Sequence, residues 1–161
     1  MKKETEFRFA QRADVPLILR FIRELAEYEE LADQVTATPE LLEEWIFDKQ
    51  KAEVIFAVED GKEVGFALFF HNFSTFLGKA GIYLEDLYVC PAYRGRGIGT
   101  ALIRKLRSIA VECGCGRLEW WCLDRNKPAI DFYLSLGAEP MSDWTTYRIT
   151  GETLAAIGRR E

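Results

Sequence analysis

The pattern of apolar and polar positions predicts a short edge strand followed by two helices. Phe7 and Phe9 fall on one face of a weakly alternating segment near the start of the chain. Asp14 then precedes a stretch reaching Leu31 in which apolar residues recur at helical spacing. Thr38 precedes a second stretch of this kind. We therefore expect a strand and then two capped helices.

Three apolar strands are predicted next, the first two joined by a tight hairpin turn at Asp60-Gly61. The predicted strands are 53–58, 63–71 and 80–90. The third is apolar on both faces except at Glu85 and Asp86, which are adjacent. Adjacent side chains alternate across a strand, so we expect these two to point to opposite faces. The sequence leaves open which of them faces a cleft.

A loop rich in arginine and glycine follows the third strand and leads directly into a helix. Arg94, Gly97 and Gly99 form an R-x-x-G-x-G pattern. Free backbone N–H groups at a helix start, together with arginine charge, favour a phosphate-bearing ligand. Glycine lets such a ligand approach the backbone closely. The alternative is a glycine-rich turn before an ordinary helix.

Two other phosphate-binding motifs are disfavoured. The chain has no G-x-x-x-x-G-K-[ST] motif, which argues against a mononucleotide P-loop. The glycines at 95, 97 and 99 do not match G-x-G-x-x-G, and we expect no βαβ unit around them. A dinucleotide-binding fold is therefore disfavoured as well.

The rest of the chain predicts a mixed sheet. After the loop, a helix carries Ile98, Leu102, Leu106, Ile109 and Cys113 on one face. The remaining predictions are a strand at 117–123, a short helix at 129–136, a strand at 144–149 and a terminal helix at 151–157. Three antiparallel strands followed by alternating helices and strands favour an α/β (α+β) fold with helices on both faces of the sheet, as a single domain over 1–161.

Several segments resemble the GNAT superfamily of acyl-CoA N-acyltransferases. Within it, the chain is similar to the diamine (spermidine/spermine) and thialysine acetyltransferase branch. The matching segments are Glu24-Leu25-Ala26, Tyr28-Glu29, Gly78-Lys79, Tyr83-Leu84-Glu85-Asp86, Tyr93-Arg94-Gly95, Gly97-Ile98-Gly99 and 126–137. The resemblance implies a mostly antiparallel sheet, acetyl-CoA as cosubstrate and, as is common in this branch, a homodimer.

The resemblance also implies which residues bind acetyl-CoA. They are Leu87, Tyr88, Val89, Arg94, Gly95, Arg96, Gly97, Ile98, Gly99, Thr100, Asn126, Ala129 and Tyr133. Asn126 is expected at the pantetheine arm, and Tyr133 is expected to protonate the departing thiolate as general acid. Spacing alone also allows Tyr133 to be part of a core stripe with Phe132.

The two strand acids and the end of the first helix are the candidates for binding the acceptor. A protonated amine must lose a proton before it can attack, and we expect Glu85 to take it through a water molecule, with Asp86 as a further substrate residue. Backbone N–H groups at 87–89 are expected to stabilise the oxyanion. An alternative is a ping-pong route through Cys122.

The resemblance further implies that Tyr28 and Glu29 hold the cationic tail of the substrate, although an acidic helix run is usually a solvated face. Phe76 stands where the branch has a tryptophan, so the acceptor stays open between polyamines, diamines and thialysine or lysine-like amines. The alternatives are a protein lysine or N-terminal acetyltransferase and a catalytically silent acyl-CoA-binding regulatory module.

Composition and charge narrow the range of partners that we expect the chain to bind. The chain has 161 residues and a net charge of −5, which disfavours nucleic acid and suits a cationic substrate. It has no apolar run of the ~20 residues that a membrane span needs, so we expect a cytoplasmic protein without a membrane partner. Cys113 and Cys115 form C-x-C without a second ligand pair, so no metal is expected.

Overall fold

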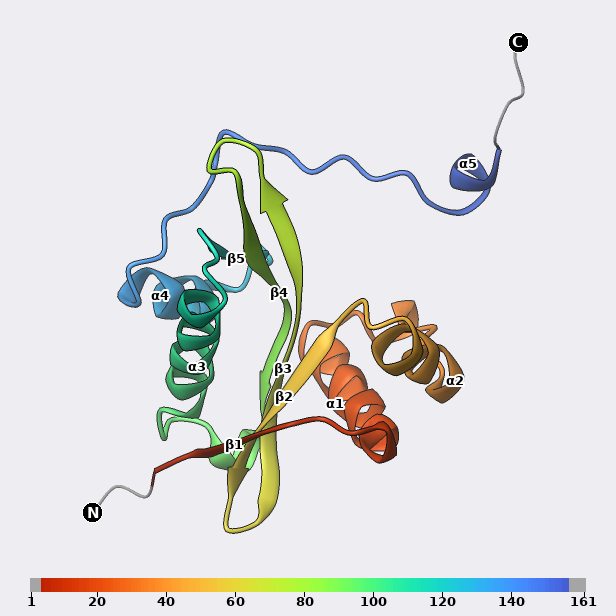
Figure 1. Ribbon diagram of the computed structural model, residues 1–161. Helices are drawn as coiled ribbons and strands as arrows, with labels where there is room; N and C mark the ends of the chain where they lie inside the picture. The colour runs from red at the N-terminus through yellow and green to blue at the C-terminus, as the bar shows by residue number, and fades with distance from the viewer. Residues whose placement is uncertain (1–3, 157–161) are drawn as a thin grey trace. The chain divides into compact units, whose positions relative to one another are not determined.

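The computed structural model of the chain describes residues 4–156. Its internal contacts form two compact units, Met1–Trp121 and Cys122–Glu161. The first unit holds a five-stranded sheet with helices on both faces, and the second holds two short helices (Figure 1).

The sheet has the strand order β1-β2-β3-β4-β5. The strands are β1 (Glu6–Phe9), β2 (Glu53–Glu59), β3 (Lys62–Ser74), β4 (Lys79–Val89) and β5 (Leu118–Trp120). The first four strands pair antiparallel, and β5 pairs parallel with β4. This confirms the predicted mixed, mostly antiparallel sheet with its first strand at an edge.

The helices of the first unit fall into two groups. Those that precede β2 are η1 (Arg12–Asp14), α1 (Val15–Tyr28), η2 (Ala32–Gln34), α2 (Pro39–Leu42) and the π-helix η3 (Glu43–Asp48). Those that follow β4 are η4 (Pro91–Tyr93) and α3 (Ile98–Glu112). Thr38 caps α2 by accepting a hydrogen bond from the Leu41 N–H at 3.2 Å. Asp14 also occupies an N-cap position, but its carboxylate pairs with Arg8 at 2.8 Å instead of with α1.

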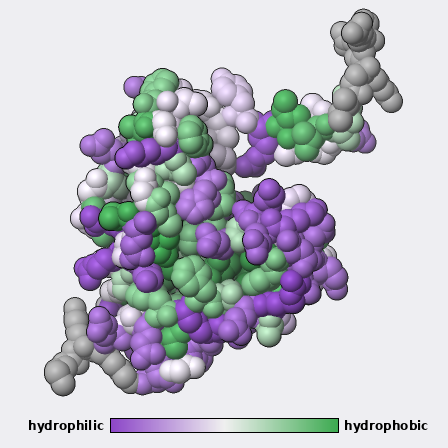
Figure 2. Space-filling model, viewed as in Figure 1, coloured by the Kyte–Doolittle hydropathy of each residue, from purple (hydrophilic) through white to green (hydrophobic). Residues whose placement is uncertain are grey.

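The core is divided between the two faces of the sheet. On one face, Ile18 and Phe21 of α1 pack with Phe66, Leu68 and Tyr88. The surface over α1 and α2 is mostly hydrophilic (Figure 2), as the polar faces of amphipathic helices require.

Helix α3 covers the other face (Figure 1). Its residues Ile98, Leu102 and Leu106 are buried, as predicted. Cys113, predicted on the same side, is exposed because the helix ends at Glu112. Helices on both faces are thus confirmed.

The predicted hairpin turn is present between β2 and β3. Asp60 and Gly61 have φ values of 52° and 73°, the left-handed pair of a two-residue hairpin. The turn places Glu59 opposite Lys62 and Val58 opposite Glu63, and a register shift between Ala57 and Val58 follows.

The prediction that no βαβ unit surrounds the glycine loop is wrong. β4, α3 and β5 form such a unit, because β5 returns parallel to β4. The prediction failed because the sequence gives a strand at 117–123 without its direction, and the parallel pairing of Leu118–Trp120 with β4 completes the unit. A dinucleotide site is then disfavoured by the glycine spacing alone.

The second unit contains α4 (Lys127–Ser135) and α5 (Gly151–Ala155). The strand predicted at 144–149 is wrong: these residues lie outside every strand that the structure describes. Trp144 and Tyr147 are exposed, and a strand needs a neighbour to pair its backbone groups. Residue 157 of the predicted terminal helix lies outside the described residues.

Candidate active site

A β-bulge in β4 decides which way its two acids point. Leu68 of β3 pairs with Asp86, whereas Phe69 pairs with Leu84, so Glu85 is an extra residue. Directly paired residues share a face of the sheet, which puts Asp86 on the face of Leu68 and Leu84 on the opposite one. Glu85 and Asp86 together oppose the single residue Leu68, as the two residues of a bulge do, and therefore lie on the same face.

The prediction that Glu85 and Asp86 point to opposite faces is therefore wrong. Simple alternation holds in a regular strand, and the bulge breaks it by inserting one residue. Both acids lie on the face that α1 covers, because Leu68 packs there with Ile18 and Phe21.

Asp86 is partly buried and feels the charges of two other acids. It is half-buried, whereas Glu85 is exposed, and Glu29 caps the C-terminal end of α1 on the same side. Burial, followed by the negative charges of Glu85 and Glu29, raises the pKa of Asp86 to about 7. We call Glu29, Glu85 and Asp86 the acid face. A carboxyl that titrates near neutral pH is a candidate for proton transfer.

The edge of β4 beside the acid face is open. The β4–β5 ladder ends where Leu84 pairs with Trp120. Beyond it, among the described strands, β4 continues to Val89 with β3 as its partner. Leu87 to Val89 therefore present one backbone edge to a ligand.

Tyr88 can meet a ligand there only through its backbone. Its ring is buried in the core, and its hydroxyl donates a hydrogen bond to Glu24 Oε2 at 2.8 Å. Burial and this carboxylate raise the pKa of the Tyr88 phenol.

The glycine loop has the predicted shape. Gly95 and Gly97 have φ values of 75° and 83°, and Gly97 is the N-cap residue of α3. The first helical hydrogen bond runs from the Ala101 N–H to the Gly97 carbonyl at 2.9 Å. The N–H groups of residues 98–100 have no acceptor within the helix and are available to an anion. The Ile98 side chain, which is buried, points into the core.

The two loop arginines are held in place. Arg94 donates from Nε to the Val89 carbonyl at 2.8 Å, and its guanidinium lies 5.0 Å from the ring centre of Tyr28. Arg96 donates from Nη2 to the Ala92 carbonyl at 3.1 Å. Tyr28, predicted at the substrate, thus lies beside Arg94, predicted at the cosubstrate.

A hollow of about 560 Å³ runs along the start of α3. Arg96, Arg104 and Lys105 give it positive charge, which a single carboxylate at Glu4 opposes. Thr100 lies in its wall. Positive charge beside a helix N-terminus fits an anionic cosubstrate such as coenzyme A.

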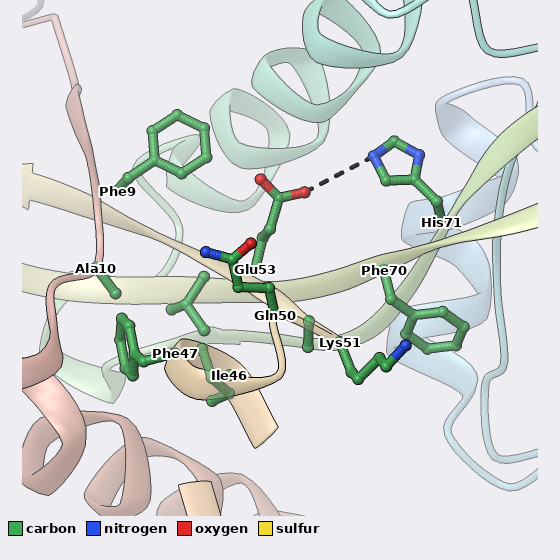
Figure 3. Close-up of a pocket in the computed structure, with 11 residues that line it drawn as sticks. Phe9, Ala10, Ile46, Phe47, Gln50, Lys51, Glu53, Phe70 and His71 are labelled. Atoms are coloured by element: carbon green, nitrogen blue, oxygen red, sulfur yellow. Dashed lines mark ion pairs between the residues drawn. The ribbon is translucent and has the colours of Figure 1, made fainter. Parts of the chain in front are cut away.

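A second hollow, of about 510 Å³, is formed by β1, η3, β2 and β3 (Figure 3). In it, Glu53 and His71 point toward each other, with 3.7 Å between Oε2 and Nε2. None of the predicted site residues lines it. We therefore do not assign the reaction to this hollow.

The second unit holds the other predicted site residues on or near α4. Asn126 is the N-cap of α4, and its Oδ1 accepts a hydrogen bond from the Ala129 N–H at 3.3 Å. Tyr133 is half-buried, with its ring centre 5.4 Å from that of Phe132. The Cys122 thiol donates to the Leu123 carbonyl at 3.5 Å.

Sequence reasoning assigned no role to Tyr83 or Glu119. Tyr83 precedes Glu85 by two residues, so alternation could have placed both on one face. Glu119 lies on β5 opposite Tyr83, a position that only the parallel pairing reveals.

Within residues 4–156, every helix is too short or too polar to cross a membrane. In the same range, histidine, cysteine and acidic side chains do not gather in threes in a way that could hold a metal ion.

Solved structures with the same fold cover nearly the whole chain. An integron cassette protein from the V. cholerae mobile metagenome superposes with a TM-score of 0.80 at 29% identity, over 98% of this chain and 99% of that one. A ribosomal-protein-alanine N-acetyltransferase from Brucella melitensis has the same fold, with a TM-score of 0.72 at 22% identity over 92% of this chain and 100% of that one. These two solved structures therefore share the fold of this chain.

Sequence comparison gives the family. Residues 18–138 match the Acetyltransferase (GNAT) family. Thialysine N-epsilon-acetyltransferase from Bos taurus is 40% identical over 93% of this chain and 95% of its own length. Spermidine/spermine N(1)-acetyltransferase-like protein 1 from Homo sapiens is 33% identical over 97% of this chain and 24% of its own length. The chain belongs to the GNAT family and is an N-acetyltransferase, for which acetyl-CoA is the implied cosubstrate.

Proposed function

We propose that this enzyme transfers the acetyl group of acetyl-CoA to a primary amine of a small cationic metabolite. The acceptor class comprises polyamines, diamines and thialysine or lysine-like amines. The names of two relatives, which cover nearly the whole chain, support this class.

The observation that carries the proposal is the acid face beside the open edge of β4. Glu85 and Asp86 share a face through the bulge, and Glu29 acts on Asp86 from the end of α1. Three carboxylates in one place attract a cation and disfavour an anionic or neutral acceptor. The net charge of −5 acts in the same direction at longer range.

The glycine loop supports binding of acetyl-CoA, which supplies an activated acetyl thioester. In the proposal, the backbone of residues 95–100 and the charges of Arg94 and Arg96 hold the pyrophosphate. The edge at Leu87 to Val89 holds the pantetheine arm and later the oxyanion. Asn126 and Ala129 contribute at the start of α4.

Proton removal is assigned to the acid face. An ammonium group with a pKa of ~10.4 must be deprotonated before it can attack a carbonyl. Glu85, exposed at the bulge, takes this proton through a water molecule. Asp86 is the second candidate, because a pKa of about 7 suits a general base at neutral pH.

Tyr133 is assigned as the general acid. A phenol with a pKa of ~10 can donate its proton to a thiolate whose thiol has a pKa of ~8.5, once charge develops on sulfur. Tyr133→Phe keeps the ring and removes the proton. We expect a loss in kcat of roughly 100-fold to 10,000-fold, with little change in the KM for acetyl-CoA.

The test is release of free thiol from acetyl-CoA with a panel of amines. The panel contains spermidine, putrescine, thialysine, lysine and a lysine-containing peptide, each with wild type and Tyr133→Phe. Turnover on the small amines that Tyr133→Phe loses supports the proposal. Turnover on the peptide alone indicates a protein acetyltransferase, and acetyl-CoA binding without turnover indicates a binding module.

We further propose that the enzyme is a homodimer. Met141, Trp144, Tyr147 and Ile149 are exposed apolar side chains in one segment of the second unit, and a contact between subunits would cover them. Light scattering should give twice the chain mass of 18.5 kDa. A monomer mass at micromolar concentration would contradict this.

A further inference from the structure

Tyr83 lies between two carboxylates on the same face of the sheet. It precedes Glu85 by two residues in β4, ahead of the bulge, so the two share a face. It also pairs with Glu119 of β5 in the parallel ladder, which puts Glu119 on that face. The surface therefore continues from the acid face across Tyr83 to Glu119.

Aromatic rings flank this continuation. The ring centres of Phe70 and Tyr83 are 5.1 Å apart, and Trp121 meets Tyr83 edge to face at 6.0 Å. Trp121 is 58% exposed, so a solute can reach its ring. Aromatic faces next to a carboxylate bind organic cations through combined cation–π and charge attraction.

The electrostatics agree with this placement. Burial raises the pKa of the Tyr83 phenol, and the negative charges of Glu85 and Glu119 raise it further. Both carboxylates therefore act on the same side chain. Glu119 accepts a hydrogen bond from Asn72 Nδ2 at 3.4 Å and lies 3.9 Å from Arg117, both long contacts that leave it able to bind a ligand.

The spacing between the two carboxylates suits a short linear diamine. Glu85 is two residues along β4 from the partner of Glu119, and neighbouring strands are one ladder spacing apart. The Cα atoms of Glu85 and Glu119 are then roughly 8 Å apart. One extended chain with an ammonium group at each end spans such a distance.

We propose that Glu119, with the rings of Tyr83 and Trp121, binds the second cationic group of the acceptor. Glu85 and Asp86 then hold the amine that is acetylated. This inference rests on the proposed function and adds the residue that sets specificity for diamines over monoamines. Glu29 lies on the α1 side of the same acids, so a longer polyamine meets a carboxylate on either side.

Glu119→Gln tests this subsite, with Glu53→Gln as the matched control. Both changes remove one carboxylate from the same sheet, but Glu53 pairs with Phe69 and so lies on the opposite face. Kd values for putrescine are measured by calorimetry in the presence of coenzyme A, and kcat/KM is compared for putrescine and butylamine. Glu119→Asp serves as the conservative variant that keeps the charge.

We expect Glu119→Gln to weaken putrescine binding and lower its kcat/KM roughly tenfold, as loss of a charge-assisted contact does. Butylamine should change less than twofold, Glu53→Gln should behave as wild type, and Glu119→Asp should restore most of the binding. Equal effects on both amines, or none on putrescine, overturn the inference.

The inference and the proposed function fail differently. Putrescine binding that is lost in Glu119→Gln, without turnover of any amine, sinks the proposed function and keeps the subsite. Turnover of amines by a wild type that binds putrescine and butylamine equally sinks the subsite and keeps the reaction. A wild type that binds no diamine overturns the subsite outright. Melting temperatures within about 1 °C of wild type exclude a folding defect.

Discussion

The glycine loop and the acid face lie next to the same half of β4 but are built in different ways. The loop presents backbone N–H groups, and its shape follows from Gly95 and Gly97 at positive φ before a helix start. The acid face presents side chains from α1 and β4, brought together by a bulge. The first depends on local sequence, and the second depends on which strands pair and in which register.

The largest loss of activity is expected from substitutions in the acid face. Glu85→Gln and Asp86→Asn should each lower kcat/KM for a diamine roughly 100-fold, because a proton acceptor or a charge at the amine is lost. The KM for acetyl-CoA should stay within twofold of wild type. Steady-state kinetics with each substrate varied in turn measure both.

The pH profile separates the two acids. The variant that removes the base should lose the acidic limb of the kcat profile, and the other variant should keep it. If both variants keep the limb and the rate, proton removal does not involve the acid face.

A change in the glycine loop should affect the KM for acetyl-CoA and not that for the amine, and by a smaller factor than the changes in the acid face. Gly97→Ala places a Cβ at a φ of 83°, where the cost is conformational because the space around it is open. We expect the KM for acetyl-CoA to rise roughly tenfold, with the KM for the amine unchanged. Gly114→Ala, also at positive φ in open space but beyond the far end of α3, is the control and should leave both values near wild type.

The smallest expected difference between the two regions is in how the melting temperature depends on pH. The pKa of Asp86 is raised from 3.8 to about 7, so the folded state holds a proton that the unfolded state releases. That stabilisation is complete below pH ~3.8 and is lost as pH rises to about 7. Asp86→Asn should therefore melt higher than wild type at pH 8, by roughly 5 °C, and the gain should shrink toward pH 5. Calorimetry at both pH values that gives a constant difference would contradict the raised pKa.

Features with a local cause could be predicted from the sequence. The Asp60-Gly61 turn, the start of α3 at Gly97 and the amphipathic face of α3 all follow from neighbouring residues. The mixed sheet and the helices on its two faces follow from these elements in order. The family resemblance, which rests on sequence segments alone, indicates the same loop and acids.

Features that depend on pairing could not be predicted. The bulge at Glu85 is invisible to alternation, because it arises from the registration of β4 on β3. The segment 144–149 has the composition of a strand, but the described chain gives its backbone no strand to pair with. The role proposed for Glu119 depends on a parallel ladder of three residue pairs.

The most direct test of the central claim compares two acceptors that differ by one charge. Initial rates of thiol release from acetyl-CoA are measured with putrescine and with butylamine, which share a carbon chain and a reactive amine. The account predicts a kcat/KM for putrescine at least tenfold higher, because carboxylates on one face of β4 and β5 bind the second ammonium. Equal values, or a preference for butylamine, would contradict selection of a small dication by this face.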